Sequence, residues 1–397
     1  MFAFAAPGTA FVLKNLAFKA TQRRSEMKLF RDVEKTGGCF GATSQRELLS
    51  YQTGALRDNV DSMMEGLAET IIQPRLASWE ITEMIPQLND QIEVFNSNPK
   101  NVLVDQLHAA AFLHNAEPRQ TGGLGHPLMP TLNQAANVTV DDVKEFMGHH
   151  FRAGNIAITG SNIDHSRLVD LSDMYFLSIP EGSNKHTPTR CSGGESIRRE
   201  DSNVAHVAVA LEAPSLQSKD LHTAGVVRAL LGEQSPRRFD RHTRVAELMK
   251  GINKDDGINS MESFIFPYSD TGLIGLIGQG HADSTYSLVE KMANLLKNLA
   301  ATKPTADELN RAKKAYRLNY INSLDSRYGP SNEIGFQLLS WGSYQEPNQV
   351  LQSIDKITAE DVNRVASEML KSEPSLAAIT STRAPVPRFD RFAGLFK

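Results

Sequence analysis

The stretch Gly8-Thr-Ala-Phe-Val-Leu-Lys-Asn-Leu-Ala-Phe-Lys-Ala-Thr21 carries most of the chemical information in this chain. On a helix, Phe11 and Asn15 lie four residues apart and therefore on one face, with Lys14 beside them. Two histidines at this spacing could bind one zinc ion, and a carboxylate between them could polarise a bound water. Here a phenyl ring has no lone pair, an amide oxygen is a ligand that zinc rarely uses, and an ammonium repels a dication.

The residues around these positions resemble the zinc-site helix of the insulinase/pitrilysin peptidases, especially the branch that includes the mitochondrial processing peptidase. That family has His-x-x-Glu-His, an apolar residue and then a turn similar to Phe-Lys-Gly-Thr. In this chain the register is set by six residues: Gly8, Leu13, Ala17, Phe18, Lys19 and Thr21.

The resemblance places Phe11 and Asn15 at the two histidine positions and Lys14 at the general-base position. The family's third ligand, a Glu, falls on Gln91. All three zinc ligands and the base are replaced together, so we expect a degenerate site: no catalytic residues, no metal, no cofactor and no enzyme activity. The adjacent His149 and His150 point about 100° apart on a helix and offer no substitute metal site.

The chain contains an internal repeat. Val138-Thr-Val-Asp-Asp-Val143 precedes a helical run and the strand-like residues 155–159, while Ile357-Thr-Ala-Glu-Asp-Val362 precedes a helical run and the strand-like residues 376–380. In both copies a threonine with an acid three residues later predicts a capped helix start.

Other elements follow in the same order in both halves. The expected pairs are two strand pairs (37–56 and 256–280), two amphipathic helices (58–72 and 284–300), two long helices (78–95 and 305–323), and two further helices containing Leu107 and Ile334. The sequence therefore predicts an α+β fold of two homologous domains, each a mainly antiparallel sheet with helices on one face.

The second half opens with a clear strand, 204–211, whose counterpart in the first half would fall before residue 1. We therefore expect the first domain to lack its first strand, and residues 8–21 to correspond to 227–240. Residues 1–25 contain four basic residues and no acid, which is also typical of a mitochondrial transit peptide. The repeat favours a domain helix instead. The predicted boundaries are an N-terminal domain at 1–180, a Gly-, Pro- and Ser-rich linker at 181–201, and a C-terminal domain at 202–397.

Composition excludes several functions. The 397 residues carry a formal net charge of −4, which gives no basic surface for nucleic acid. No run of apolar residues is long enough to span a membrane, so membrane association is expected only through partners. Two cysteines are too few for a disulfide framework and favour a reducing compartment.

Within the family, the resemblance is strongest to the non-catalytic core subunits of the respiratory bc1 complex. It rests on five segments in order: 56–65, 79–81 with 86–88, 101–112, 268–275, and 341–344 leading to 350–355. It implies a dimeric assembly on the matrix side of the mitochondrial inner membrane. The partners would be a second core subunit, cytochrome b, cytochrome c1 and the iron–sulfur subunit, which hold the redox cofactors.

The alternative is the non-catalytic α subunit of the processing peptidase, which binds presequences. That subunit has a glycine-rich loop after the first helix of its second half. The equivalent stretch here, Leu231-Gly-Glu-Gln-Ser-Pro-Arg-Arg238, contains one glycine and an arginine pair. It lacks the backbone freedom of a glycine run, which counts against the alternative.

Overall fold

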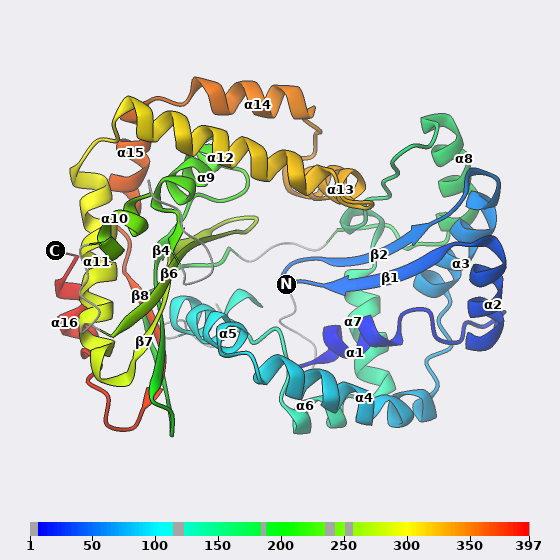
Figure 1. Cartoon of the computed structure of the whole chain (residues 1–397). Helices are drawn as coiled ribbons and strands as arrows, with labels where there is room; N and C mark the ends of the chain where they lie inside the picture. The colour runs from blue at the N-terminus through cyan, green and yellow to red at the C-terminus, as the bar shows by residue number, and fades with distance from the viewer. Residues whose placement is uncertain (1–6, 114–122, 184–187, 235–242, 251–256, 397) are drawn as a thin grey trace. The chain divides into compact units, whose positions relative to one another are not determined.

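The computed structural model describes residues 7–113, 123–183, 188–234, 243–250 and 257–396 (Figure 1). The chain forms two compact units that differ from the predicted sequence halves. Unit 1 comprises Met1–Ser97, Leu128–His186 and Ser326–Leu339, and unit 2 comprises Asn98–Pro127, Thr187–Asp325 and Ser340–Lys397.

Unit 2 contains a six-stranded sheet in the order β3-β8-β4-β7-β6-β5, in which only the β3–β8 pair is parallel. The strands are β3 (Gly194–Glu200), β4 (Val204–Glu212), β5 (Glu233–Gln234), β6 (Ile258–Pro267), β7 (Gly272–His281) and β8 (Ser375–Ser381). The predicted strands at 204–211 and 376–380 and the strand pair at 256–280 are confirmed within the described residues. Strand β3, however, lies inside the predicted linker. It forms because β8 would otherwise leave one edge unpaired, and backbone pairing at an edge makes little demand on side-chain pattern.

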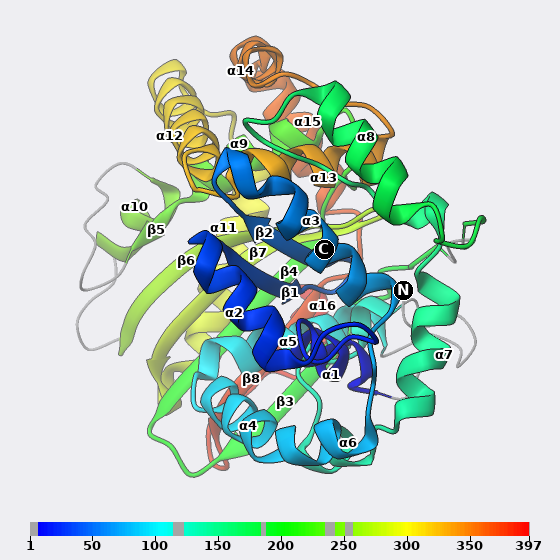
Figure 2. The same cartoon turned by 90° about the vertical axis from the view of Figure 1, so that its right-hand side faces the viewer.

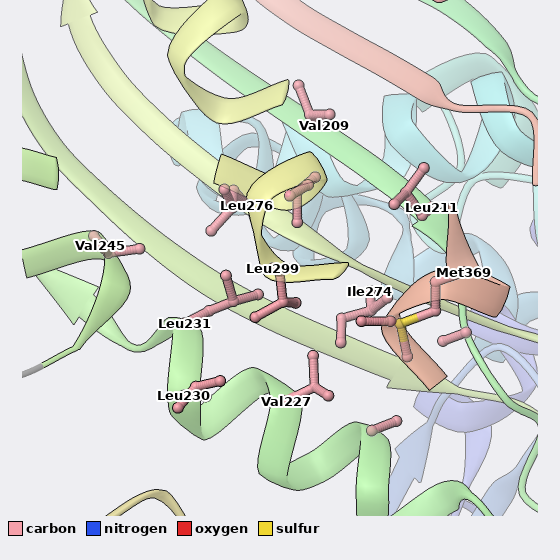
Figure 3. Close-up of a cluster of buried hydrophobic side chains, with 14 of the residues drawn as sticks. Val209, Leu211, Val227, Leu230, Leu231, Val245, Ile274, Leu276, Leu299 and Met369 are labelled. Atoms are coloured by element: carbon pink, nitrogen blue, oxygen red, sulfur yellow. The ribbon is translucent and has the colours of Figure 1, made fainter. Parts of the chain in front are cut away.

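Side chains of β4 alternate between two apolar layers, as the twofold period of a strand requires. Val207, Val209 and Leu211 face the large core that includes α9 (Leu221–Leu231), α11 (Thr285–Ala301) and α15 (Ala359–Met369) (Figure 3). Ala208 and Ala210 face the opposite layer, where α5 (Pro99–Phe112) packs through Leu103 and Leu107. Helices therefore cover both faces of this sheet, and one of them comes from the first half of the sequence. The other helices of unit 2 are α10 (Arg244–Lys250), α12 (Ala306–Leu324), α14 (Pro347–Lys356) and α16 (Phe389–Gly394).

Unit 1 contains a two-stranded antiparallel sheet, in which β1 (Cys39–Ser44) pairs with β2 (Leu49–Gly54). Strand β2 packs against α3 (Figure 2). The helices are α1 (Thr9–Leu16), α2 (Glu26–Thr36), α3 (Val60–Ile72), α4 (Ser78–Asn96), α6 (Leu132–Asn137), α7 (Val140–His150), α8 (His165–Phe176) and α13 (Gly329–Trp341), whose last two residues fall outside the unit. The predicted helices in both halves are thus confirmed.

The two helices that follow the repeated motif start in the same way. Thr139 accepts a hydrogen bond from the backbone N–H of Asp142 at 3.2 Å, and the Asp142 carboxylate accepts one from the Thr139 N–H at 2.8 Å. Thr358 and Asp361 repeat this arrangement at 3.2 and 2.9 Å. Each aspartate carboxylate also accepts a hydrogen bond from the threonine hydroxyl, and this bond, together with the one from the threonine N–H, lowers the pKa of both aspartates below 3.8. The predicted caps are therefore confirmed, and with them the repeat at this point.

The strand predicted at 155–159 is wrong. Residues 153–155 form a short 3₁₀ turn, and residues 156–160 are irregular although Ile156 is extended. The counterpart in unit 2, β8, is a strand because it pairs with β3 and β4. Among the described residues of unit 1, no strand pairs with residues 156–160.

The two halves of the sequence each contribute one helix to the other unit. Helix α5 belongs to unit 2, and the first turns of α13 belong to unit 1. There Ser331 O accepts a hydrogen bond from Thr159 Oγ1 at 2.9 Å, and Asn332 Oδ1 accepts one from Gln52 Nε2 at 2.9 Å. Periodicity does not reveal which sheet a helix will cover, so the sequence alone did not predict this exchange.

The mapping of residues 8–21 onto 227–240 holds only approximately. Helix α9 ends at Leu231, so only residues 227–231 of the mapped range lie in that helix, and residues 235–240 lie outside the described part of the chain. None of the helices that the structure describes is long and apolar enough to cross a membrane.

Candidate functional site

Helix α1 carries the predicted degenerate site and is anchored in the core of unit 1. It begins after Gly8, whose φ of 95° is a left-handed conformation that favours glycine. A Cβ at this position would also lie 2.8 Å from Pro130 Cβ. The buried side chains of α1 pack with α4 and α7 in one apolar cluster: Phe11, Val12, Leu13, Leu16, Ile81, Met84, Leu88, Ile92, Val143 and Phe146. Residues 9–16 are therefore an integral helix of unit 1.

The structure brings Asn15 and Gln91 together across 76 positions of sequence. Gln91 Nε2 donates a hydrogen bond to Asn15 Oδ1 at 3.0 Å, and Asn15 Nδ2 donates to Phe11 O at 2.9 Å. A neutral pair of amides thus lies where the family resemblance places a histidine and a glutamate. The Gln91 nitrogen and the Asn15 oxygen are bonded to each other, and the Asn15 nitrogen is bonded to the main-chain oxygen of Phe11.

The two other predicted positions lie beside this pair. Phe11 is only 6% exposed and belongs to the apolar cluster. Lys14 Nζ lies 5.8 Å from the centre of the Phe11 ring, which is within the range of a cation–π contact. The group at the general-base position is therefore a cation over an aromatic face, and it neither accepts a proton from water nor attracts a metal ion.

Within the described ranges, no group of three or more His, Cys, Asp or Glu side chains could hold a metal ion. The arrangement around α1 forms hydrogen bonds and apolar contacts.

Sequence reasoning missed a polar network that fixes the turn after α1. Thr21 Oγ1 donates to Glu69 Oε2 at 3.1 Å, and Arg24 forms ion pairs with Glu65 and with Glu69. Glu69 is only 6% exposed, and a buried carboxylate is stable only when it is paired and hydrogen-bonded. This network ties the turn to α3. The signal was present in the i, i+4 spacing of Glu65 and Glu69, but their partner could not be read from sequence.

Aromatic stacking holds the same turn from the other side. Phe18 adopts a φ of 63°, an uncommon conformation for a residue with a side chain, and its ring stacks on Phe40 of β1 with 4.4 Å between centroids. Polar contacts and aromatic stacking thus both hold the turn that follows α1.

Comparisons with known proteins agree with this geometry. The sequence model described as "Insulinase (Peptidase family M16)" matches residues 4–123, and the model described as "Peptidase M16 inactive domain" matches residues 137–316. The chain belongs to the insulinase family, peptidase family M16. The expectation of an α+β metallopeptidase-like fold is thereby confirmed.

Similar individual proteins fall into two groups. The Arabidopsis thaliana "Probable mitochondrial-processing peptidase subunit alpha-1, mitochondrial" is 26% identical over 395 residues, which is 98% of this chain and 77% of that protein. The Rattus norvegicus "Cytochrome b-c1 complex subunit 2, mitochondrial" is 26% identical over 373 residues, which is 94% of this chain and 80% of that protein.

A solved structure shares the fold. A chain of "Complex III2 from Candida albicans, Inz-5 bound" superposes with a TM-score of 0.81 at 18% identity, covering 98% of this chain and 90% of that one.

Proposed function

We propose that this chain is a non-catalytic structural core subunit of mitochondrial respiratory complex III, equivalent to core protein 2, needed for the assembly and stability of the complex that transfers electrons from ubiquinol to cytochrome c. Its partners would be core protein 1, cytochrome b, cytochrome c1 and the iron–sulfur subunit of the dimeric complex. It would lie on the matrix side of the inner membrane and reach the membrane only through these partners.

The observation that best supports the proposal that the chain is non-catalytic is the hydrogen bond between Gln91 and Asn15. A hydrolytic zinc site needs three lone-pair donors and a base at these positions. By the family resemblance, Phe11, Asn15 and Gln91 fall at the ligand positions and the cation of Lys14 falls at the base position. A fold that keeps its scaffold and offers no reactive group is suited to building interfaces.

The assembly part is supported by the relatives named subunit 2 of the cytochrome b-c1 complex, which match 94% of this chain, and by the similar chain in a complex III structure. The α subunit of the processing peptidase is the competing candidate, because a relative of that name matches 98% of the chain. The loop expected to discriminate the two contains Gly232, with φ of 72°, while residues 235–238, including Arg237 and Arg238, lie outside the described part of the chain.

One experiment separates the two candidates. Mitochondrial inner membranes are solubilised in a mild detergent, and the chain is followed by native electrophoresis and immunoprecipitation. Co-migration with cytochrome b and cytochrome c1 at constant stoichiometry is the expected result. Recovery only as a soluble heterodimer with a catalytic peptidase subunit would overturn the proposal in favour of the α-subunit function.

A second measurement tests the non-catalytic part. The purified chain is dialysed against trace zinc and its metal content is determined by mass spectrometry, in parallel with a peptide-cleavage assay. We expect substoichiometric zinc and no cleavage. One zinc ion per chain, or cleavage that a chelator abolishes, would contradict the structure of the site.

A further inference from the structure

Helix α2 has an outer side that leaves apolar surface in water. Met27 is 63% exposed and Phe30 is 62% exposed, and their spacing of three residues places them on one side of the helix. Leu29 and Val33, on the opposite side, are buried in unit 1. Large apolar side chains that gather on one exposed helix side are typical of a contact surface.

The charges on this outer side of α2 are mainly positive. Lys28, Arg31 and Lys35 are exposed and follow one another at spacings of three and four residues, so they line one side of the helix. Among the residues that the structure describes, no carboxylate forms an ion pair with any of these three cations. Glu34 is the one exposed acid between them. We call this surface the basic face, and it consists of Met27, Lys28, Phe30, Arg31 and Lys35.

Helix α8 has an outer side with the opposite charge. Its apolar residues Val169, Met174 and Leu177 are between 42% and 80% exposed. Asp170 and Asp173 lie among them, are exposed, and have no ion-pair partner in the described part of the chain. On a helix these five positions fall within an arc of about 140°, so they share one side. We call this surface the acidic face.

The two faces flank helix α3. Leu29 of α2 lies against α3, with its Cδ1 atom 3.3 Å from the position that a Cβ would take at Gly66. Leu171 of α8 packs with Met64 and Leu67 of α3 in one apolar cluster. Figures 1 and 2 both show α3 between α2 and α8 in unit 1. The basic face and the acidic face therefore belong to one layer of helices.

Helix α3 adds no unpaired charge between the faces. Ser62 is the one exposed residue of α3. Glu65 of α3 pairs with Arg24, and Asp61 of α3 pairs with Arg167 of α8. A second copy of this layer can therefore approach α3 without bringing unpaired like charges together.

We propose that unit 1 binds a second copy of this chain, with the basic face of each copy against the acidic face of the other. A two-fold axis near α3 forms both contacts at once, because the interface of a two-fold dimer joins one surface patch to the same patch on its partner. This association is independent of the function proposed above, because it uses the outer sides of α2 and α8 and not the residues around α1.

Charge and length both point to a second copy as the occupant. Three cations of the basic face meet Asp170 and Asp173, so each sign of charge finds the other across the interface, which fixes the register and speeds encounter. Helix α2 has 11 residues and α8 has 12, so both are about 16–18 Å long and can lie along one another. The apolar residues of both faces leave water together, and this burial supplies the main attraction.

The first test measures the association of the full chain by sedimentation velocity at about 0.1 M salt. We expect a concentration-dependent dimer with a micromolar dissociation constant, because two helix-to-helix contacts lie at the lower end of interface sizes. A chain that remains monomeric at about 100 μM would overturn the proposal. Oligomers that grow without stopping at a dimer would also overturn it, because a two-fold interface closes.

Charge reversal locates the contact. Lys28→Glu with Arg31→Glu makes the basic face acidic, and Asp170→Lys with Asp173→Lys makes the acidic face basic. Each double variant alone should associate at least about tenfold more weakly, because like charges then meet at both contacts. An equimolar mixture of the two should restore the dimer, since opposite charges again face each other at both contacts. A mixture that stays monomeric, or a dimer that survives either reversal, would refute this arrangement.

A matched control separates the contact from net charge. Asp90→Lys with Glu93→Lys reverses two exposed carboxylates on α4 of the same unit and should leave the dissociation constant unchanged within about twofold, because salt screens charges outside the interface. Circular dichroism and thermal unfolding establish that each variant is folded. Equal weakening by the control would assign the effect to net charge and contradict the proposed contact.

Cross-linking of the native chain keeps the test decisive if a variant does not fold. Copies with ordinary and heavy nitrogen are mixed, and a carbodiimide joins lysine amines to carboxylates that lie in contact. We expect mixed-isotope peptides that join Lys28 or Lys35 to Asp170 or Asp173. Dimers whose cross-links between copies all fall on other surfaces would overturn the proposal.

Discussion

Restoring the lost ligands should convert the amide pair into a zinc site, because the helix frame has kept its positions. The variant carries Phe11→His, Asn15→His and Gln91→Glu, with Lys14→Glu to remove the repulsive cation. The side chains at 15 and 91 already touch, with 3.0 Å between Gln91 Nε2 and Asn15 Oδ1. Positions 11 and 15 lie on one face of α1, so three ligands can converge on a single ion.

The expected change in unfolding free energy follows from the burial of Phe11 and from the binding of zinc to the folded state. Phe11 is 6% exposed, and replacing its ring by a polar imidazole is expected to cost about 3 kcal/mol of unfolding free energy. Zinc at about 100 times its dissociation constant stabilises the folded state by about 2.7 kcal/mol. The metal-free variant should therefore melt about 6–12 °C below the native chain, and zinc should restore most of the difference.

The assay is thermal unfolding with and without zinc, accompanied by calorimetric titration. The control variant keeps Gln91 and carries only the other three changes, so it has two ligands and should bind zinc at least about tenfold more weakly. A folded four-position variant that shows no response to zinc would refute the assignment of these positions. A native chain that is itself stabilised by one equivalent of zinc would refute the degenerate site.

Three further predictions test the fold and its charges. Leu107→Ala, at a fully buried site of α5, should lower the unfolding free energy of unit 2 by about 2–5 kcal/mol in chemical denaturation, whereas Lys100→Ala on the exposed side should change it by less than about 1 kcal/mol. Equal effects of the two changes would argue against the packing of α5 on the unit 2 sheet. Thr358→Ala should cost about 1 kcal/mol near neutral pH. Because Thr358 lowers the pKa of Asp361 below 3.8, this contribution is present above that pH and should fade in melts at lower pH, as the carboxylate protonates. Burial, reinforced by the charge of Glu212, raises the pKa of the Cys191 thiol to about 12. Alkylation of Cys191 at pH 8 should therefore be about a hundredfold or more slower in the native chain than in the unfolded chain. Equal rates for Cys191 in the two states would contradict its burial.

Short sequence patterns were sufficient to predict features that depend only on neighbouring residues. Thr139 with Asp142 and Thr358 with Asp361 form their capping bonds within one turn, so a four-residue pattern predicted both helix starts correctly. The loss of lone pairs at Phe11 and of a base at Lys14 is a property of residue type alone. The positions themselves came from the family resemblance, and that resemblance also pointed to Gln91.

Pairing between distant segments was decided only in three dimensions. Residues 155–159 have the composition of a strand, but no strand among the described residues pairs with them, whereas residues 194–200 look like a linker and become a strand by pairing with β8. The exchange of α5 and α13 between the units depends on which sheet faces offered small residues and hydrogen-bond partners.

The sequence by itself determined the helices and their caps, because each of these depends on residue types within a few positions of one another. The tertiary structure determined that Asn15 meets Gln91 and that Thr21 and Arg24 are tied to buried Glu69. These features depend on the burial and hydrogen bonding of groups far apart in the chain, and only the folded backbone brings such groups together.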